Sequence, residues 1–195
     1  MTSSGTIEPQ PWVRRFAPLV APGGVVLDVA CGGGRHARHF LSRGHPVLCL
    51  DRDVSGVADL ASQPRAEIVE ADLEGGGPWP LAARTFAGIV VVNYLYRPIL
   101  PDLVEALAPG GVLIYETFGR GNERFGRPRR PQYLLRSGEL LDLGSGRLQV
   151  VAYEHGIAAG NSHSKVVQRL CAVNDGGTAT GGDCDPYAIN PPDNG

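Results

Sequence analysis

The segment from Val25 to His36, VVLDVACGGGRH, constrains the fold more than any other part of the chain. An apolar, β-branched run is interrupted by an aspartate, three consecutive glycines follow, and residues compatible with a helix begin at once. This order predicts a strand, a tight turn and a helix whose first backbone amides face a ligand. A chain built around such a unit is expected to be an α/β protein.

Strand and helix patterns alternate along the rest of the chain. Apolar and β-branched runs predict seven strands, over residues 25–29, 46–50, 66–70, 86–92, 112–117, 148–153 and 165–173. Apolar spacing and helix-start signals predict helices over residues 12–19, 35–43, 54–61, 99–107 and 137–143. This alternation is typical of a doubly wound α/β sheet.

Length and composition favour one domain with a sizeable core, since the chain has 195 residues and is 43% apolar. We expect a flexible N-terminus over residues 1–10, a folded domain over residues 11–174 and a disordered tail over residues 175–195. No apolar run is long enough to span a bilayer, and the N-terminus lacks the apolar core of a secretory signal. The sequence therefore predicts a cytoplasmic protein without membrane contact.

The cysteines give no sign of metal or redox chemistry. Cys31, Cys49, Cys171 and Cys184 show no CxxC spacing and have no nearby histidine partner. We interpret them as small buried or turn residues, and no metal site is predicted.

The glycine turn is compatible with two kinds of ligand. Gly32 to Ala37 matches G-x-G-x-x-A, a dinucleotide fingerprint that many α/β turns also satisfy. Acidic residues at three successive strand ends separate the alternatives. Asp28, before the turn, suits a cationic amine, and Asp51 can accept two ribose hydroxyls. Asp72 and its apolar neighbour can hold an adenine, so the set predicts a zwitterionic adenosyl ligand rather than a pyrophosphate.

Five segments in this order resemble the class I S-adenosylmethionine-dependent methyltransferases: LDVACGGG (27–34), LD (50–51), ADL (71–73), VVNY (91–94) and LAPGGVL (107–113). Within that class the chain is most similar to small bacterial stand-alone enzymes, including tellurite-resistance-type methyltransferases. The resemblance covers about residues 25–117, with compatible strands to residue 173. It implies a Rossmann-like seven-stranded sheet with an antiparallel last strand and helices on both faces, and S-adenosylmethionine as the cofactor.

The resemblance also implies roles for the polar residues at the strand ends. Asp28 would hold the amine of the methionine part, and Asp51 would bind the ribose hydroxyls. Asp72 and Leu73 would hold the adenine. Asn93, just after the fourth predicted strand, would lie beside the sulfonium.

The turn itself would allow a close approach of the backbone to the cofactor at Ala30, Gly32 and Gly34. Ala30 stands where the class usually has its first glycine, and alanine suits that position if its φ stays negative. Arg35, at the start of the following helix, is either a surface residue or a contact for the methionine carboxylate.

Methyl transfer needs a general base only if the acceptor must lose a proton. Residues able to act lie at predicted strand ends: Tyr94, Tyr96, Glu116, Tyr133, His155 and His163. Tyr94, His155 and His163 are the candidates we retain, the two histidines because they flank the predicted loop Gly156–Ser162. For each of them a structural role is favoured over a catalytic one.

An arginine-rich segment, residues 120–136, is the main indication of the acceptor. It holds six arginines and one glutamate in a chain with a formal net charge of −2. It is either a solvated loop over the site or a lid that binds an anionic acceptor through Arg124, Arg127, Arg129 and Arg130. A surface for single-stranded RNA would use the same residues, but it is disfavoured because the remaining chain is net acidic.

The sequence therefore predicts an S-adenosylmethionine-dependent methyltransferase acting on a small-molecule or oxyanion acceptor, and less readily on RNA. Two other classes stay open. An NAD(P)-binding oxidoreductase would use the same glycine turn, although the chain offers no obvious room for a substrate domain. A non-catalytic protein that binds an adenosyl ligand would show binding without turnover.

Overall fold

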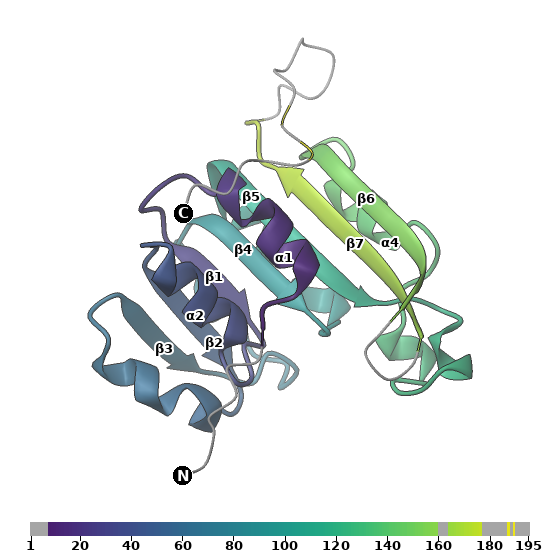
Figure 1. Cartoon of the computed structure of the whole chain (residues 1–195), viewed down its shortest axis with the longest axis horizontal. Helices are drawn as coiled ribbons and strands as arrows, with labels where there is room; N and C mark the ends of the chain where they lie inside the picture. Colours follow the sequence, from purple (N-terminus) through teal and green to yellow (C-terminus); the bar gives the residue numbers. More distant parts are fainter. Residues whose placement is uncertain (1–7, 160–163, 177–186, 188, 190–195) are drawn as a thin grey trace.

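Seven strands form one sheet, in the order β3-β2-β1-β4-β5-β7-β6, in the computed structural model, which describes residues 8–159, 164–176, 187 and 189 (Figure 1). The strands are β1 (Val26–Val29), β2 (Val47–Asp51), β3 (Ala66–Glu70), β4 (Phe86–Val92), β5 (Leu107–Phe118), β6 (Gln149–Ala158) and β7 (Lys165–Val173). β1 to β5 are parallel, and β7 is antiparallel to both β5 and β6. The predicted doubly wound, Rossmann-like sheet with an antiparallel last strand is confirmed.

The direction in which strands are added reverses between β1 and β4. From β1 the chain builds outward through β2 to β3, and then returns to the other side of β1 for β4 and β5. At such a point the loops that follow the two central strands diverge, which opens a crevice at the carboxyl edge of the sheet. A ligand site is therefore expected beyond the carboxyl ends of β1 and β4.

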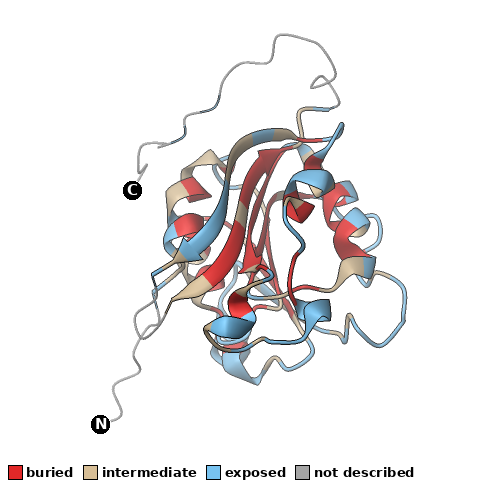
Figure 2. Ribbon diagram, turned by 90° about the vertical axis from the view of Figure 1, so that its right-hand side faces the viewer, coloured by how far each residue is buried: buried red, intermediate tan, exposed pale blue. Residues whose placement is uncertain are grey.

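Helices cover both faces of the sheet, as predicted (Figure 1). One face carries α1 (Pro11–Phe16), α2 (Arg35–Ser42) and the 3₁₀ helix η2 (Ser55–Ser62), and the other carries α3 (Leu100–Glu105) and α4 (Glu139–Gly144). Side chains alternate between the two faces along each strand, so one strand serves both apolar layers. Val26 packs in the layer under α1 and α2, whereas Leu27 packs in the opposite layer. Figure 2 shows the central strands buried between these layers.

Some element boundaries differ from those predicted. The N-terminal α-helix ends at Phe16 and continues as a 3₁₀ helix, η1 (Ala17–Leu19), because Pro18 has no backbone N–H to donate. The helix predicted after β2 is the 3₁₀ helix η2 rather than an α-helix. β6 continues to Ala158 because it pairs with β7 as far as Lys165. His155 therefore lies inside a strand, and the prediction that it flanks a loop beginning at Gly156 is wrong.

The predicted end segments are described only in part. Residues 1–7 and most of residues 175–195 lie outside the described residues. Among the residues that the structure describes, no helix has the length and apolar character needed to cross a membrane. Cys31, Cys49 and Cys171 are buried free thiols, which confirms their interpretation, and Cys184 lies outside the described residues.

Candidate functional site

A cavity of about 330 Å³ lies where the carboxyl ends of β1 to β4 meet. Its lining residues follow successive strands: Ala30 after β1, Asp51 and Arg52 at β2, Ala71 to Glu74 after β3, and Tyr94 after β4. One further lining residue, Tyr133, comes from the distant arginine-rich segment. The cavity thus lies at the switch point of the sheet, where α/β proteins bind ligands.

The glycine turn after β1 uses left-handed backbone at three positions. Gly32 and Gly34 have φ values of 51° and 70°, which glycine adopts without steric cost. Ala30 also has a positive φ, 52°, so the condition under which alanine suits this position, a negative φ, is not met. The amide of the next residue, Cys31, donates to Leu50 O (3.2 Å), and the left-handed Ala30 lies between this bond and the end of β1.

The glycines of the turn have different steric surroundings. A Cβ added to Gly32 or Gly33 would meet no protein atom within 4 Å, so the chain leaves room beside both. A Cβ on Gly34 would lie 2.5 Å from Cγ1 of Val57, because η2 packs directly on the turn. The space beside Gly32 and Gly33 is therefore open, although none of the three glycines lines the cavity, whereas Gly34 is required by packing within the protein.

Asp51 joins the end of β2 to the glycine turn. Its Oδ2 accepts a hydrogen bond from the amide of Gly32 (2.8 Å), and its Oδ1 accepts one from the amide of Asp53 (3.2 Å). A carboxylate has about four acceptor positions, so acceptor capacity remains for a ligand in the cavity. The structure thus holds Asp51 on the cavity wall in a fixed orientation.

Asp72 and Leu73 lie together on the wall beyond β3. Asp72 Oδ1 accepts a hydrogen bond from the amide of Glu74 (2.9 Å), which shapes the turn. Leu73 is partly buried and belongs to the same apolar cluster as Tyr94. The wall therefore offers an acceptor group beside an apolar surface, the combination predicted for an adenine site.

Asp28 lies beneath the turn rather than on the cavity wall. It is 2% exposed, and its Oδ2 accepts a hydrogen bond from the amide of Ala37 (3.0 Å), while Oδ1 lies 3.8 Å from Nδ1 of His36. Burial raises the pKa of the Asp28 carboxyl to about 7, and burial lowers the pKa of His36 to about 3. In this structure Asp28 anchors α2 to β1.

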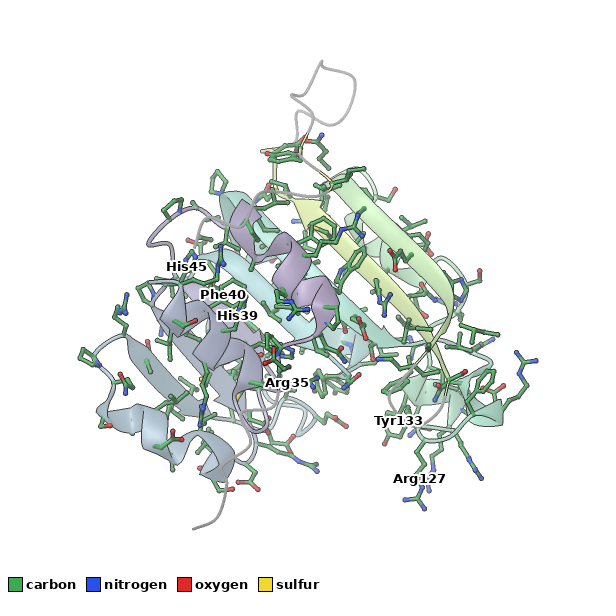
Figure 3. All side chains as sticks on the ribbon, in the orientation of Figure 1. Arg35, His39, Phe40, His45, Arg127 and Tyr133 are labelled. Carbon is green, nitrogen blue, oxygen red and sulfur yellow. The ribbon has the colours of Figure 1, made fainter. Side chains whose placement is uncertain are left out.

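Asn93 follows β4 in a left-handed conformation, with a φ of 59° that asparagine tolerates better than most residues. Its amide donates to the carbonyl oxygen of Glu116 (2.9 Å), and the residue is exposed at the carboxyl edge. Arg35 begins α2 beside the glycine turn (Figure 3). The structure thus places both residues at the edge that carries the cavity, although neither lines it.

The proton-acceptor candidates have very different surroundings. Tyr94 lines the cavity, and burial, assisted by Glu74 and Asp72, raises the pKa of its phenol well above the usual value. His155 is an exposed residue of β6 that lies beside Gly119 and not on the cavity wall. His163 lies outside the described residues.

Glu116 is fully buried and takes part in two ion pairs. Its carboxylate oxygens accept hydrogen bonds from Lys165 Nζ (2.7 Å) and Arg169 Nε (2.9 Å). Both oxygens of this carboxylate are thus occupied by cations of β7. Glu116 is therefore better explained as a structural group that joins β5 to β7.

The arginine-rich segment forms a folded cap, which we define as residues 119–138. Leu135 pairs with the end of β5: its amide donates to Phe118 O, and its carbonyl accepts from the amide of Arg120, both at 2.9 Å. The four arginines predicted to bind an anion, Arg124, Arg127, Arg129 and Arg130, are exposed and do not line the cavity. Figure 3 shows Arg127 directed away from the sheet.

Sequence reasoning did not assign Arg52, Ala71 or Glu74 to the site. Each is a direct neighbour or near neighbour of a predicted acid, so proximity along the chain was the available signal. Tyr133 was considered only as a base, and its place on the cavity wall has no local sequence signal. It depends on how the cap folds back toward β4.

The fold is similar to those of known methyltransferases. No protein-family model matches the sequence, and no curated protein is significantly similar to it. TehB from Haemophilus influenzae superposes with a TM-score of 0.65 at 15% identity, over 81% of this chain and 60% of TehB. The chain thus spans less than two thirds of TehB.

Two further solved structures match over most of their length. A SAM-dependent methyltransferase from Methanosarcina mazei gives a TM-score of 0.65 at 14% identity, over 86% of this chain and 99% of that one. The 1,6-didemethyltoxoflavin-N1-methyltransferase of Burkholderia thailandensis, solved with its substrate and S-adenosylhomocysteine, gives 0.60 at 19% identity, over 84% and 76%. This chain therefore has the fold of the class I S-adenosylmethionine-dependent methyltransferases.

Proposed function

We propose that the chain is an S-adenosylmethionine-dependent methyltransferase that acts on a small-molecule acceptor. The observation that carries the proposal is the composition of the switch-point cavity, where Asp51, Asp72 and Leu73 share one wall beside an open glycine turn. The methyltransferase fold supports the same reading. The buried free thiols are compatible with a reducing compartment such as the cytoplasm.

The residues present fit an adenosyl ligand. Asp51 has acceptor capacity for ribose hydroxyls, and Asp72 can accept from an adenine amino group while Leu73 packs against the ring. Space beside Gly32 and Gly33 would receive the part of the ligand that approaches the backbone. Asp28 would act indirectly, because its carboxylate holds α2 behind the turn and does not reach the cavity wall.

When bound, S-adenosylmethionine supplies a methyl group carried on a positively charged sulfur. A lone pair of the acceptor can attack the methyl carbon in line with the carbon–sulfur bond, and the sulfur leaves as the neutral thioether. The chain's contribution is then to orient the reactants and exclude water. The Tyr94 phenol stays protonated at neutral pH and can donate a hydrogen bond, whereas Glu116 is held in ion pairs. This favours an acceptor whose lone pair is available at neutral pH.

S-adenosylhomocysteine binding, measured by isothermal titration calorimetry, tests the proposal. Asp51→Asn should weaken binding by about tenfold or more, because a hydrogen bond to a charged group is lost. Asp59→Asn is the matched control, since Asp59 forms an exposed ion pair with Arg38 (2.7 Å) away from the site. Wild-type protein that binds NADH and not S-adenosylhomocysteine would show that the oxidoreductase alternative is correct.

The acceptor itself we propose to be anionic and recruited by the cap. Arg124, Arg127, Arg129 and Arg130 present exposed guanidinium groups on the segment that also supplies Tyr133 to the cavity. A transfer assay with labelled cofactor and a panel of carboxylate, phosphate and neutral acceptors tests this. Replacing all four arginines by glutamine should raise KM for the anions alone. Binding without transfer to any acceptor would instead favour a non-catalytic protein.

A further inference from the structure

The cap contributes one aromatic side chain to the cavity, and an arginine that pairs with a buried carboxylate fixes the backbone that carries it. We infer that Tyr133 contacts the nucleoside part of the bound cofactor and that Arg97, which does not itself line the cavity, is the residue that positions Tyr133. The inference rests on the proposed function and adds to it one further wall of the cofactor site, formed by Tyr133.

Tyr133 is the last residue of the short 3₁₀ helix η5 (Pro131–Tyr133). Its side chain lines the same cavity as Asp51, Asp72 and Leu73, the residues predicted to hold the adenosine. It is 37% exposed, which is unusual for an aromatic residue whose backbone is firmly held. A ligand in the cavity would cover part of this ring, and aromatic faces pack favourably on nucleobases.

Arg97 holds the backbone on both sides of Tyr133. This residue begins the 3₁₀ helix η3 (Arg97–Ile99), and its Nη1 donates to the carbonyl oxygen of Gln132 (2.7 Å). Its Nη2 donates to the carbonyl oxygen of Leu134 (3.0 Å). One guanidinium group therefore binds the carbonyl oxygens of the two residues that flank the tyrosine.

Glu139, at the start of α4, holds the guanidinium in place. Its Oε1 accepts from Arg97 Nε (2.6 Å) and its Oε2 accepts from Arg97 Nη2 (3.0 Å), which is a bidentate pair. The Glu139 side chain is 7% exposed, and Oε2 also accepts from the amide of Arg136 (2.7 Å). Burial would raise the pKa of this carboxyl, but the hydrogen bonds from Arg97 and Arg136 hold it below the usual value.

Arg97 also connects the cap to the segment after β4 that carries Tyr94, a second lining residue. It lies three residues after Tyr94, whose carbonyl accepts a hydrogen bond from the hydroxyl of the buried Tyr115 (3.0 Å). The segment that carries Arg97 is thus attached to β5, and the guanidinium group extends that attachment to the cap. The two lining residues Tyr94 and Tyr133 thus belong to segments that this connection joins.

Other contacts hold the cap but do not reach Tyr133. Asn122 is buried, its Oδ1 accepts from the amide of Val166 (3.1 Å), and its Nδ2 donates to Pro128 O (3.2 Å). The two backbone hydrogen bonds between Leu135 and the end of β5 also remain without Arg97. Loss of the Arg97 contacts should therefore loosen η5 between two attached points, the η4 end (Asn122–Arg124) at β7 and Leu135 at β5.

The experiment compares S-adenosylhomocysteine and adenosine binding in four variants by calorimetry. Tyr133→Ala should weaken both ligands by about fivefold or more, and Tyr133→Phe should bind within about twofold of wild type, because the ring makes the contact. Arg97→Met should weaken both ligands as Tyr133→Ala does. Arg84→Met is the matched control: Arg84 forms an equally close bidentate pair with Glu67 (2.7 and 2.8 Å) outside this cavity and should leave binding unchanged.

Limited trypsin digestion gives a second readout that does not depend on a ligand. Trypsin cuts poorly before proline, so the bonds after Arg124 and Arg129 report on the exposed tip of the cap. Arg97→Met should speed cleavage after Arg129 by several fold more than cleavage after Arg124. Arg97→Lys, which keeps the charge but not the bidentate geometry, should give an intermediate rate.

The outcomes separate the two proposals. Wild-type protein that does not bind S-adenosylhomocysteine overturns the proposed function and this inference with it. Wild-type binding together with unchanged affinities in Tyr133→Ala overturns the contact assigned to Tyr133 alone. Arg97→Met that is digested and binds like wild type overturns the positioning role of Arg97.

Discussion

Replacing Ala30 by glycine should make the protein more stable, against the usual effect of adding a glycine. Ala30 has a φ of 52°, and a left-handed conformation costs a residue with a Cβ about 1–2 kcal/mol. Glycine adopts that conformation freely but loses about 0.5–1 kcal/mol through its larger backbone entropy in the unfolded chain. The net gain in the free energy of unfolding should be about 0.5–1 kcal/mol.

Urea unfolding followed by circular dichroism measures this gain as a rise of about 0.3–0.5 M in the midpoint, if m is about 2 kcal/mol/M. Two further alanines serve as controls. Ala83 also has a positive φ, 65°, and is exposed outside this cavity, so Ala83→Gly should stabilise by a similar amount. Its neighbour Ala82 has no such conformation, and Ala82→Gly should be neutral or destabilising.

An Ala30→Gly variant that is less stable than wild type, while Ala83→Gly is more stable, would refute the reasoning at the turn. It would mean that the Cβ of Ala30, which lines the cavity, makes contacts that outweigh the backbone strain. S-adenosylhomocysteine binding to the same variant adds a functional comparison. We expect affinity equal to or tighter than that of wild type, because the substitution removes a methyl group from the cavity wall.

Other expectations concern buried charge and packing. Asp28→Asn should gain stability relative to wild type as the pH of a urea titration rises from about 5 to about 8. The Asp28 carboxyl has a pKa of about 7 in the native protein and 3.8 in the unfolded chain, so the native form binds more protons across that window and wild-type stability falls as the pH rises. A difference in stability between the variant and wild type that stays constant with pH would contradict this. Glu116→Gln should lower the free energy of unfolding by about 2–3 kcal/mol, since Lys165 loses its carboxylate partner and Arg169 keeps only its ion pair with Glu154, and an unchanged urea midpoint would refute the ion-pair role. Gly34→Ala should lower the thermal midpoint by several degrees because its Cβ has no room, whereas Gly33→Ala, which has space, should not.

Most of the fold followed from local patterns in the sequence. The seven predicted strands and the doubly wound arrangement are present, because apolar periodicity and glycine or proline breaks are properties of short segments. The error at β6 arises because distant pairing extends the strand. β6 reaches Ala158 only because β7 pairs with it along its whole length, and no local signal at Gly156 or Ile157 indicates that partner.

The site residues likewise fall into those that local sequence patterns predict and those that depend on distant contacts. Asp51, Asp72 and Leu73 line the cavity as the strand-end argument predicted, because the carboxyl ends of parallel strands meet at one edge. The backbone of Ala30 could not be predicted, since its sign of φ depends on how β1 turns toward α2. For the arginine-rich segment the sequence left a solvated loop and an anion-binding lid as alternatives, and the cap residue that lines the cavity is Tyr133.

The position of Tyr133 in the cap depends on distant parts of the chain, whereas the positions of the strand-end residues depend on neighbouring ones. Asp51 and Asp72 are placed by β2 and β3, at whose ends they lie. Any sequence change that preserves those strands therefore preserves the part of the cavity wall that these two acids form. Tyr133 is placed by a pair, Arg97 and Glu139, whose members are 42 positions apart. Substitutions within the cap can therefore change the position of Tyr133 in the cavity while the strand-end residues keep theirs. Ligand preference in this chain should consequently change most readily through the cap, and cofactor binding should be lost most readily through the strand ends.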